Sequence, residues 1–125
     1  MQLSTLLRLQ VLYAVLGIAY NGVSIYFASA FKQPLAPTQP ALGIITMVVY
    51  ALFLLPGFLG KTVLYRVLMA VAIIVIGYGG VVTHLINIFT QPQLYHSLIA
   101  WSFAVGINLF GLVLNMVAVV GKFKK

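Results

Sequence analysis

Residues 70–89 are the feature that most limits what this chain can fold into, because they are apolar over a length that can cross a bilayer. A transmembrane helix needs about 20 predominantly apolar residues. His84 is the only side chain in this run that can carry a charge near neutral pH. At helical spacing Gly77, Gly80 and His84 share one face, whereas the other faces are apolar. We therefore expect a transmembrane helix whose small and polar face packs against other helices.

Three further apolar runs predict the rest of the fold. We expect spans at residues 11–31, 41–60, 63–89 and 97–120, joined by short loops. The sequence is 63% hydrophobic and only 6% charged, and its mean hydropathy is +1.15, values far from those of a soluble domain. It thus predicts an all-α integral membrane protein, a single transmembrane domain over residues 1–125. Packing faces that repeat every three and four residues favour a left-handed bundle of the four helices.

The basic residues predict the orientation of this bundle. The chain has seven Lys and Arg and no Asp or Glu. With four spans, all of the basic residues except Lys32 fall at one end: Arg8, Lys61, Arg66, Lys122, Lys124 and Lys125. Because Lys and Arg are enriched on the cytoplasmic side, we expect both termini there, and we place the chain in the inner membrane of a bacterium. Basic residues at the ends of spans anchor a helix in lipid, so no nucleic-acid partner is expected.

Aromatic residues near the ends of the spans predict a belt at each membrane surface. Trp and Tyr are enriched where the hydrocarbon meets the head groups. We expect Tyr26, Tyr95 and Trp101 near the outer surface, and Tyr13 and Tyr65 near the inner one.

The residue types that are absent from the sequence exclude most catalytic, ion-coupled and metal-binding functions. Without Asp and Glu the chain has neither a Ser-His-Asp triad nor a pair of catalytic carboxylates. Cation-coupled transport usually depends on an acidic residue within the membrane. The absence of cysteine removes thiol catalysis, and two histidines alone supply too few ligands for a usual metal site. We therefore expect a protein that is not an enzyme and that needs no metal or cofactor.

Two asparagines fall near the middle of the first and last spans. An amide in hydrocarbon costs several kcal/mol unless it is hydrogen-bonded. We expect Asn21 and Asn108 to bond each other, or the backbone, and so to fix the register of the bundle. Alternatively, they line a polar path together with Asn115.

His84 is the only candidate for binding a cofactor. Ionisable residues inside the membrane mark functional sites by default. His84 could ligate a b-type haem together with His96, or donate to a quinone carbonyl. The structural alternative is a neutral His84 that bonds Ser97, Thr83 or a backbone carbonyl.

Small residues predict where helices come close. Gly77, Gly80 and Gly111 lie on the packing faces, where we expect them to let neighbouring helices approach. Other small residues lie off those faces: Gly22, Ser29, Ala51, Ala72 and Gly106. Small residues help association in lipid only where another helix can come near, so this surplus indicates a protein neighbour.

These observations predict a small accessory subunit that packs against a larger membrane protein complex and stabilises or positions it. Its partner would be another integral membrane protein or further copies of the chain. One alternative is an uncoupled oligomeric transporter or channel, with a path lined by Asn21, Asn108 and Asn115. A second alternative is a haem- or quinone-binding electron-transfer subunit that uses His84.

Overall fold

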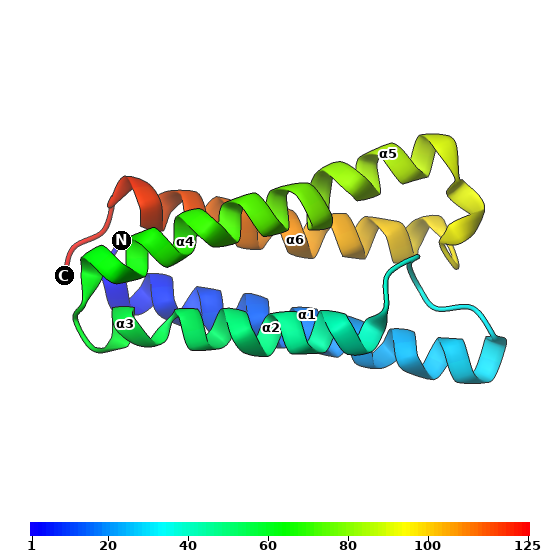
Figure 1. Cartoon of the computed structure of the whole chain (residues 1–125), viewed down its shortest axis with the longest axis horizontal. Coiled ribbons are helices and arrows are strands. Elements are labelled where there is room, and N and C mark those ends of the chain that lie inside the picture. The colour runs from blue at the N-terminus through cyan, green and yellow to red at the C-terminus, as the bar shows by residue number, and fades with distance from the viewer.

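The computed structural model describes residues 1–125, and almost all of them lie in helices (Figure 1). Four helical segments are long and apolar enough to cross a membrane. They consist of α1 (Leu3–Phe31), α2 (Pro40–Phe53) with α3 (Leu55–Phe58), α4 (Thr62–Ile76) with the π-helix η1 (Gly77–Val82) and α5 (Thr83–Thr90), and α6 (Leu98–Val120). A 3₁₀ turn, η2 (Pro92–Leu94), precedes α6. The chain is an all-α membrane protein, as its sequence predicts.

The first helix begins at Leu3, eight residues before the expected start of the first span at residue 11. Leu3, Leu6 and Gln10 recur at steps of three and four and are buried, so this stretch has a packing face of its own. Arg8 lies on the exposed side of the helix and does not interrupt that face. The early start brings Gln10 inside the bundle.

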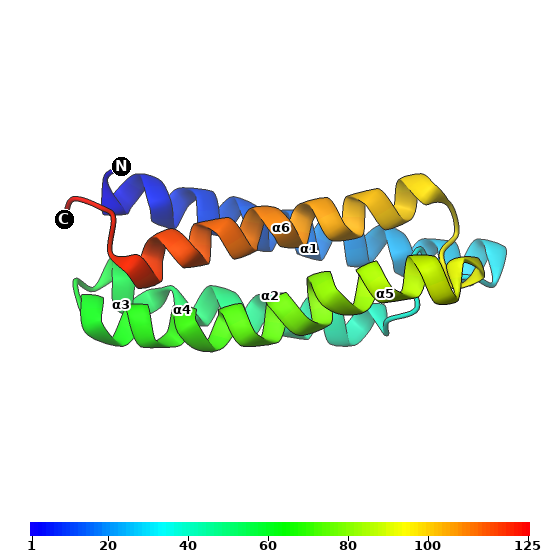
Figure 2. The same ribbon diagram turned by 90° about the horizontal axis from the view of Figure 1, so that it is seen from above.

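The four segments run alternately up and down, and α1 lies between α2 and α6 (Figures 1 and 2). Helix α4 packs mainly on α6 and makes less contact with α2. The bundle therefore has an α1–α6 face and, opposite it, a more loosely packed face between α2 and α4–η1. These two faces are the places where the fold can offer a surface or a cavity.

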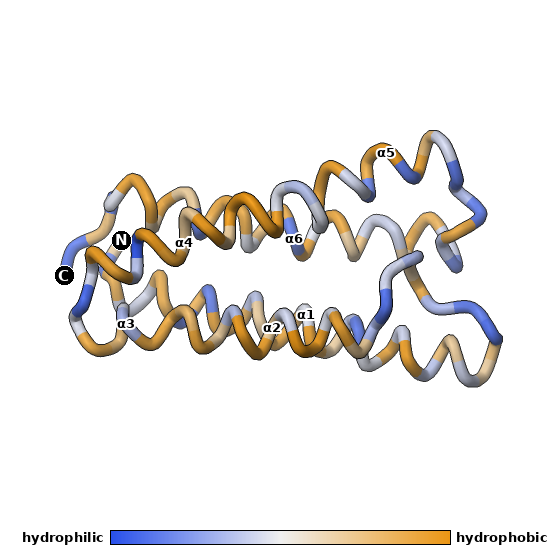
Figure 3. The backbone as a smooth tube through the Cα atoms, viewed as in Figure 1, coloured by the Kyte–Doolittle hydropathy of each residue, from blue (hydrophilic) through white to orange (hydrophobic).

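The chain termini and the turn between α3 and α4 meet at one end, the terminal end; the other two connections form the loop end (Figure 1). The terminal end carries the six basic residues that the sequence groups together. Hydrophobic residues cover the helices between the two ends (Figure 3). Side chains such as Phe89 and Ile74 are 87% and 72% exposed, as suits residues that face lipid. The handedness of the bundle and its cytoplasmic orientation stay predictions.

Candidate functional site

A buried polar network joins four helices, α1, α2, α4 and α6, in the half of the bundle near the terminal end. Gln10 Nε2 donates to Asn115 Oδ1 over 3.0 Å, and Gln10 Oε1 accepts from the Tyr65 hydroxyl. The Tyr50 hydroxyl also donates to Asn115 Oδ1, over 2.7 Å, whereas Asn115 Nδ2 has no partner. All four side chains are at most 4% exposed. We call Gln10, Tyr50, Tyr65 and Asn115 the polar network.

The expected belt of Tyr13 and Tyr65 at the inner surface is wrong, because both side chains are fully buried. Each hydroxyl finds a partner on another helix, which lets the ring lie in the core. The Tyr13 hydroxyl donates to Asn108 Oδ1 over 3.0 Å, and its ring meets that of Tyr50 edge-on with centroids 5.1 Å apart. Tyr95, expected at the outer surface, is also buried.

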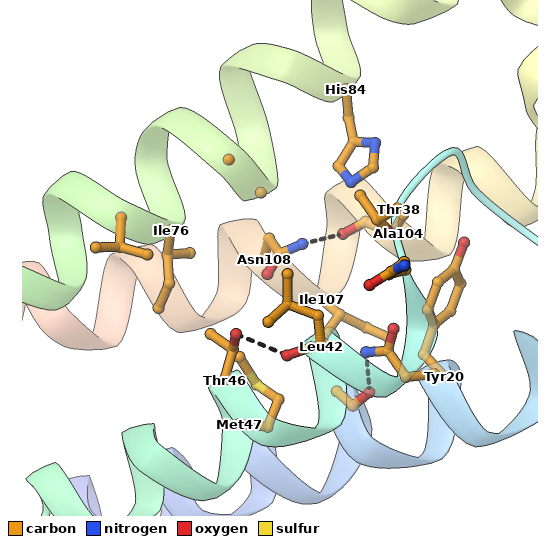
Figure 4. A pocket seen from close by; sticks show the side chains of 17 residues that line it. Tyr20, Thr38, Leu42, Thr46, Met47, Ile76, His84, Ala104, Ile107 and Asn108 are labelled. Carbon is orange, nitrogen blue, oxygen red and sulfur yellow. Dashed lines mark hydrogen bonds between the residues drawn. The ribbon is translucent and has the colours of Figure 1, made fainter. Parts of the chain in front are cut away.

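A cavity of about 290 Å³ lies on the loop side of the polar network, and all four segments line it (Figure 4). We call it the loop-side cavity. Its polar lining residues are Tyr20, Asn21, Thr38, Gln39, Thr46, His84 and Asn108. Leu42, Met47 and Ile76 are among its apolar residues, and none of the polar network residues reaches it.

Local irregularity opens the bundle around this cavity. The π-helix η1 adds an extra residue to the turn, and the Thr83 hydroxyl donates to the Tyr78 carbonyl five residues earlier, over 2.8 Å. Such π-helical turns occur frequently at functional sites. Gly80 lies within η1, where a Cβ would be only 2.6 Å from Asn108 Cγ, so the Asn108 side chain packs directly on the Gly80 backbone.

Asn21 and Asn108 both line the loop-side cavity, but neither amide bonds the other. Asn21 Nδ2 donates to the Gly17 carbonyl over 2.8 Å, and Asn108 Nδ2 donates to the Ala104 carbonyl over 2.9 Å. The expected hydrogen bond between Asn21 and Asn108 is therefore absent, and the alternative, a bond from each amide to the backbone, is present. A carbonyl one turn earlier is always within reach of a helical asparagine, so it competes well with a distant amide.

His84 is buried, and its ring extends into the loop-side cavity (Figure 4). Its Nδ1 atom lies 2.6 Å from the Tyr95 hydroxyl, and its carbonyl accepts from Trp101 Nε1 over 2.9 Å. The side-chain bonds expected from Ser97 or Thr83 do not form. Burial raises the pKa of the Tyr95 hydroxyl, which therefore keeps its proton. The imidazole is thus held by a neutral partner.

His96 does not join His84 in one site. Its ring packs edge-on against Phe27, with centroids 4.7 Å apart, and also contacts Phe31. It lines a different hollow, outside the loop-side cavity. Because the two imidazoles do not converge, the arrangement does not fit a haem with two histidine ligands.

The α1–α6 face is hollowed along part of its length. Two adjoining hollows of about 380 and 540 Å³ share Leu16, Phe103 and Ile107. We call them together the α1–α6 groove. Gly106 lines it, and a Cβ built there would meet no atom within 4 Å. Gly22 is equally open but lines none of the three hollows described here.

The other small residues divide between core and surface. A Cβ on Gly111 would lie 2.5 Å from the Tyr13 ring, so Gly111, like Gly80, is needed for close packing. Gly77 is not, because a Cβ there would make only an ordinary 3.8 Å contact with Leu112. Ala72, expected off the packing faces, is instead 5% exposed within the core. Ala51 is also packed against the core.

A comparison with protein-family models, curated proteins and solved structures finds nothing that matches this chain. Three parts of the fold are then candidates for function. The polar network uses most of its donors and acceptors internally, which suits a structural role. The loop-side cavity and the α1–α6 groove lie on opposite faces and are open to other molecules.

Proposed function

We propose that this protein is a non-enzymatic accessory subunit, which packs against a larger integral membrane protein and stabilises or positions it. The observation that carries the proposal is the α1–α6 groove with the open Gly106 in its lining. Helices associate in lipid through close packing, and small residues let their backbones approach. A transmembrane helix of a partner fits a groove of this kind.

The charge distribution favours a different protein over a second copy as this partner. Six basic residues lie at the terminal end, and the chain has no Asp or Glu to neutralise them. Only Arg66 has its side chain engaged, with Nε and Nη2 donating to the Val119 carbonyl over 3.0 and 2.7 Å. Copies inserted in the same orientation would bring like charges together, which opposes association. A partner with acidic loops at this end would instead be attracted.

The alternative of an uncoupled transporter or channel has less support. Asn21 and Asn108 do line one cavity, but Asn115 belongs to the polar network. The packed side chains of Tyr50 and Tyr65 occupy the interior at that level. The polar residues therefore do not line one continuous path in this conformation.

Co-purification from the native host in mild detergent tests the accessory function. We expect the tagged wild type to bring down an integral membrane protein. Gly106→Leu places a large side chain in the groove and should leave the fold intact, since Gly106 is exposed and a Cβ there meets no atom within 4 Å. If the substitution weakens the binding of the partner by about 1.4 kcal/mol, recovery of the partner falls about tenfold at equal expression.

Gly79→Leu is the matched control, because Gly79 is also exposed and open but lies in η1, on the opposite face. It should retain the partner. Equal losses for the two variants would contradict docking at the α1–α6 groove. A wild type that purifies alone as a monomer would contradict the accessory function itself.

A further inference from the structure

We infer that the loop-side cavity binds a neutral, lipid-soluble molecule through a carbonyl oxygen, as a quinone ring or a lipid ester would offer. The cavity opens on the face opposite the α1–α6 groove, and Tyr20 and Ile107 stand between the two and line both. It would give the subunit a ligand in addition to a partner.

The position of the opening favours a ligand that arrives from the lipid. The cavity is lined on one side by Leu42 of α2 and on the other by Val75 of α4, and these side chains are 58% and 53% exposed. Between them η1 presents Gly79, where a Cβ would meet no atom within 4 Å. An apolar chain attached to the ligand can therefore leave sideways between α2 and η1. Thr38 and Gln39, which directly precede α2, are the lining residues from a loop.

The lining excludes a charged head group. No Lys or Arg lines the cavity, and the chain contains no Asp or Glu. A phosphate or carboxylate would be buried without a countercharge, as would an ammonium group, and each carries a large desolvation cost. The group that enters the cavity is therefore uncharged.

The cavity offers N–H donors without a partner in the protein, so the ligand should carry a hydrogen-bond acceptor. We assign the Tyr95 hydroxyl as the donor to His84 Nδ1, 2.6 Å away, which leaves the imidazole proton on Nε2. Nε2 forms no hydrogen bond within the protein, and the ring extends into the cavity (Figure 4). Asn108 and Asn21 each use one amide hydrogen on the backbone, so each has a second hydrogen to donate. Several N–H donors in an apolar setting suit a carbonyl oxygen.

The size of the cavity agrees with a ring or a single ester group. Pockets for small ligands usually measure about 300–1,000 Å³, and this one of about 290 Å³ is at the lower limit. Only the head of a larger amphiphile would therefore be enclosed.

Fluorescence of Trp101 provides the test. It is the only tryptophan in the chain, and its Nε1 bonds the His84 carbonyl, so it lies beside the site. Purified protein in phosphatidylcholine nanodiscs is titrated with decyl-benzoquinone, whose ring quenches indole emission. We expect saturable quenching, at least about tenfold weaker affinity in Gly79→Leu, and no change in Gly106→Leu.

Competition with a short-chain diacylglycerol distinguishes the two sources of the carbonyl. Displacement of the quinone identifies an ester carbonyl as a ligand, and saturable quenching without displacement identifies the quinone. His84→Phe, which removes the donor but keeps a ring, should also weaken binding. Since His84→Phe could disturb folding, Gly79→Leu decides the outcome, because Gly79 is exposed and a Cβ there meets no atom within 4 Å. Quenching that rises linearly and equally in the wild type and Gly79→Leu would overturn the site.

Discussion

Single polar side chains hold this bundle together by sharing partners across helices. Gln10 alone connects α1 to Tyr65 on α4 and to Asn115 on α6. A side-chain hydrogen bond between membrane helices contributes only about 0.6 kcal/mol on average, and up to about 1.7. The network therefore stabilises the fold through the number of its bonds, and it specifies which faces of the helices meet.

The hydrogen bond between Tyr13 and Asn108 predicts energetic coupling between these two residues. Tyr13→Phe and Asn108→Leu should each lower the free energy of unfolding in mixed micelles by about 1 kcal/mol. The double variant should lose less than the sum, by about 0.6 kcal/mol. The control is the pair Asn21→Leu and Asn108→Leu, whose effects should add because each amide bonds its own backbone. Strong coupling in the control pair would contradict this assignment.

The sequence predicts some of these residues and not others. The periodicity correctly places Asn21, Asn108 and His84 toward the interior, because their spacing matches that of neighbouring small residues. It does not predict the roles of Gln10 and Tyr65. Gln10 precedes the apolar run, although its spacing from buried leucines is a signal that it lies on a packing face. A tyrosine near the end of a span can lie at the membrane surface or in the core of the bundle. Whether its hydroxyl finds a hydrogen-bond partner on another helix decides between the two positions.

At the scale of elements, η1 contributes the backbone of Gly79 and Gly80 to the lining of the loop-side cavity. Its sequence GYGGVV is poor in helix-stabilising residues, so the glycines lower the cost of departing from α-helical geometry. The sequence predicts one long helix over residues 63–89 but contains no signal for a π-helical turn. The packing of α6 against this segment decides which carbonyl each backbone N–H of η1 bonds. This is a tertiary effect that the local sequence does not encode.

Two glycines in η1, one residue apart, should respond to alanine in opposite ways. A Cβ at Gly80 collides with Asn108, whereas a Cβ at Gly79 meets nothing. Gly80→Ala should therefore destabilise the protein by about 1–3 kcal/mol through overpacking. Gly79→Ala should be neutral or stabilise it by up to about 1 kcal/mol, because alanine loses less backbone entropy. Unfolding in mixed micelles measures both, and equal destabilisation by the two variants would argue against the close contact of η1 with α6.

At the scale of the whole molecule, both ends of the bundle are closed by contacts between distant parts of the chain. At the terminal end, Leu3 N donates to the Lys124 carbonyl over 2.7 Å. At the loop end, Leu35 N donates to Ser24 Oγ over 2.9 Å, and the Leu35 carbonyl accepts from His96 N over 3.2 Å. The number and order of the helices follow from the apolar runs, but these connections do not. They join loops whose sequences contain no periodic pattern.

The asymmetry of charge between the two ends predicts the topology of the chain in cells. The terminal end carries six of the seven basic residues, so it should face the cytoplasm. The natural chain has no cysteine, and Thr38, Gln93 and Lys125 are all exposed, which allows single cysteines to be placed at these positions. In intact cells a membrane-impermeant maleimide should label Thr38→Cys and Gln93→Cys but not Lys125→Cys.

After the cells are broken, Lys125→Cys should react as well, which shows that its protection came from the membrane and not from burial. Labelling of Lys125→Cys in intact cells would place the basic end outside. The loop-side cavity would then lie in the cytoplasmic half of the bilayer, and the acidic loops proposed for the partner would have to lie on the outer surface. The orientation thus fixes which leaflet surrounds the loop-side cavity and on which side of the membrane the acidic loops of the partner lie.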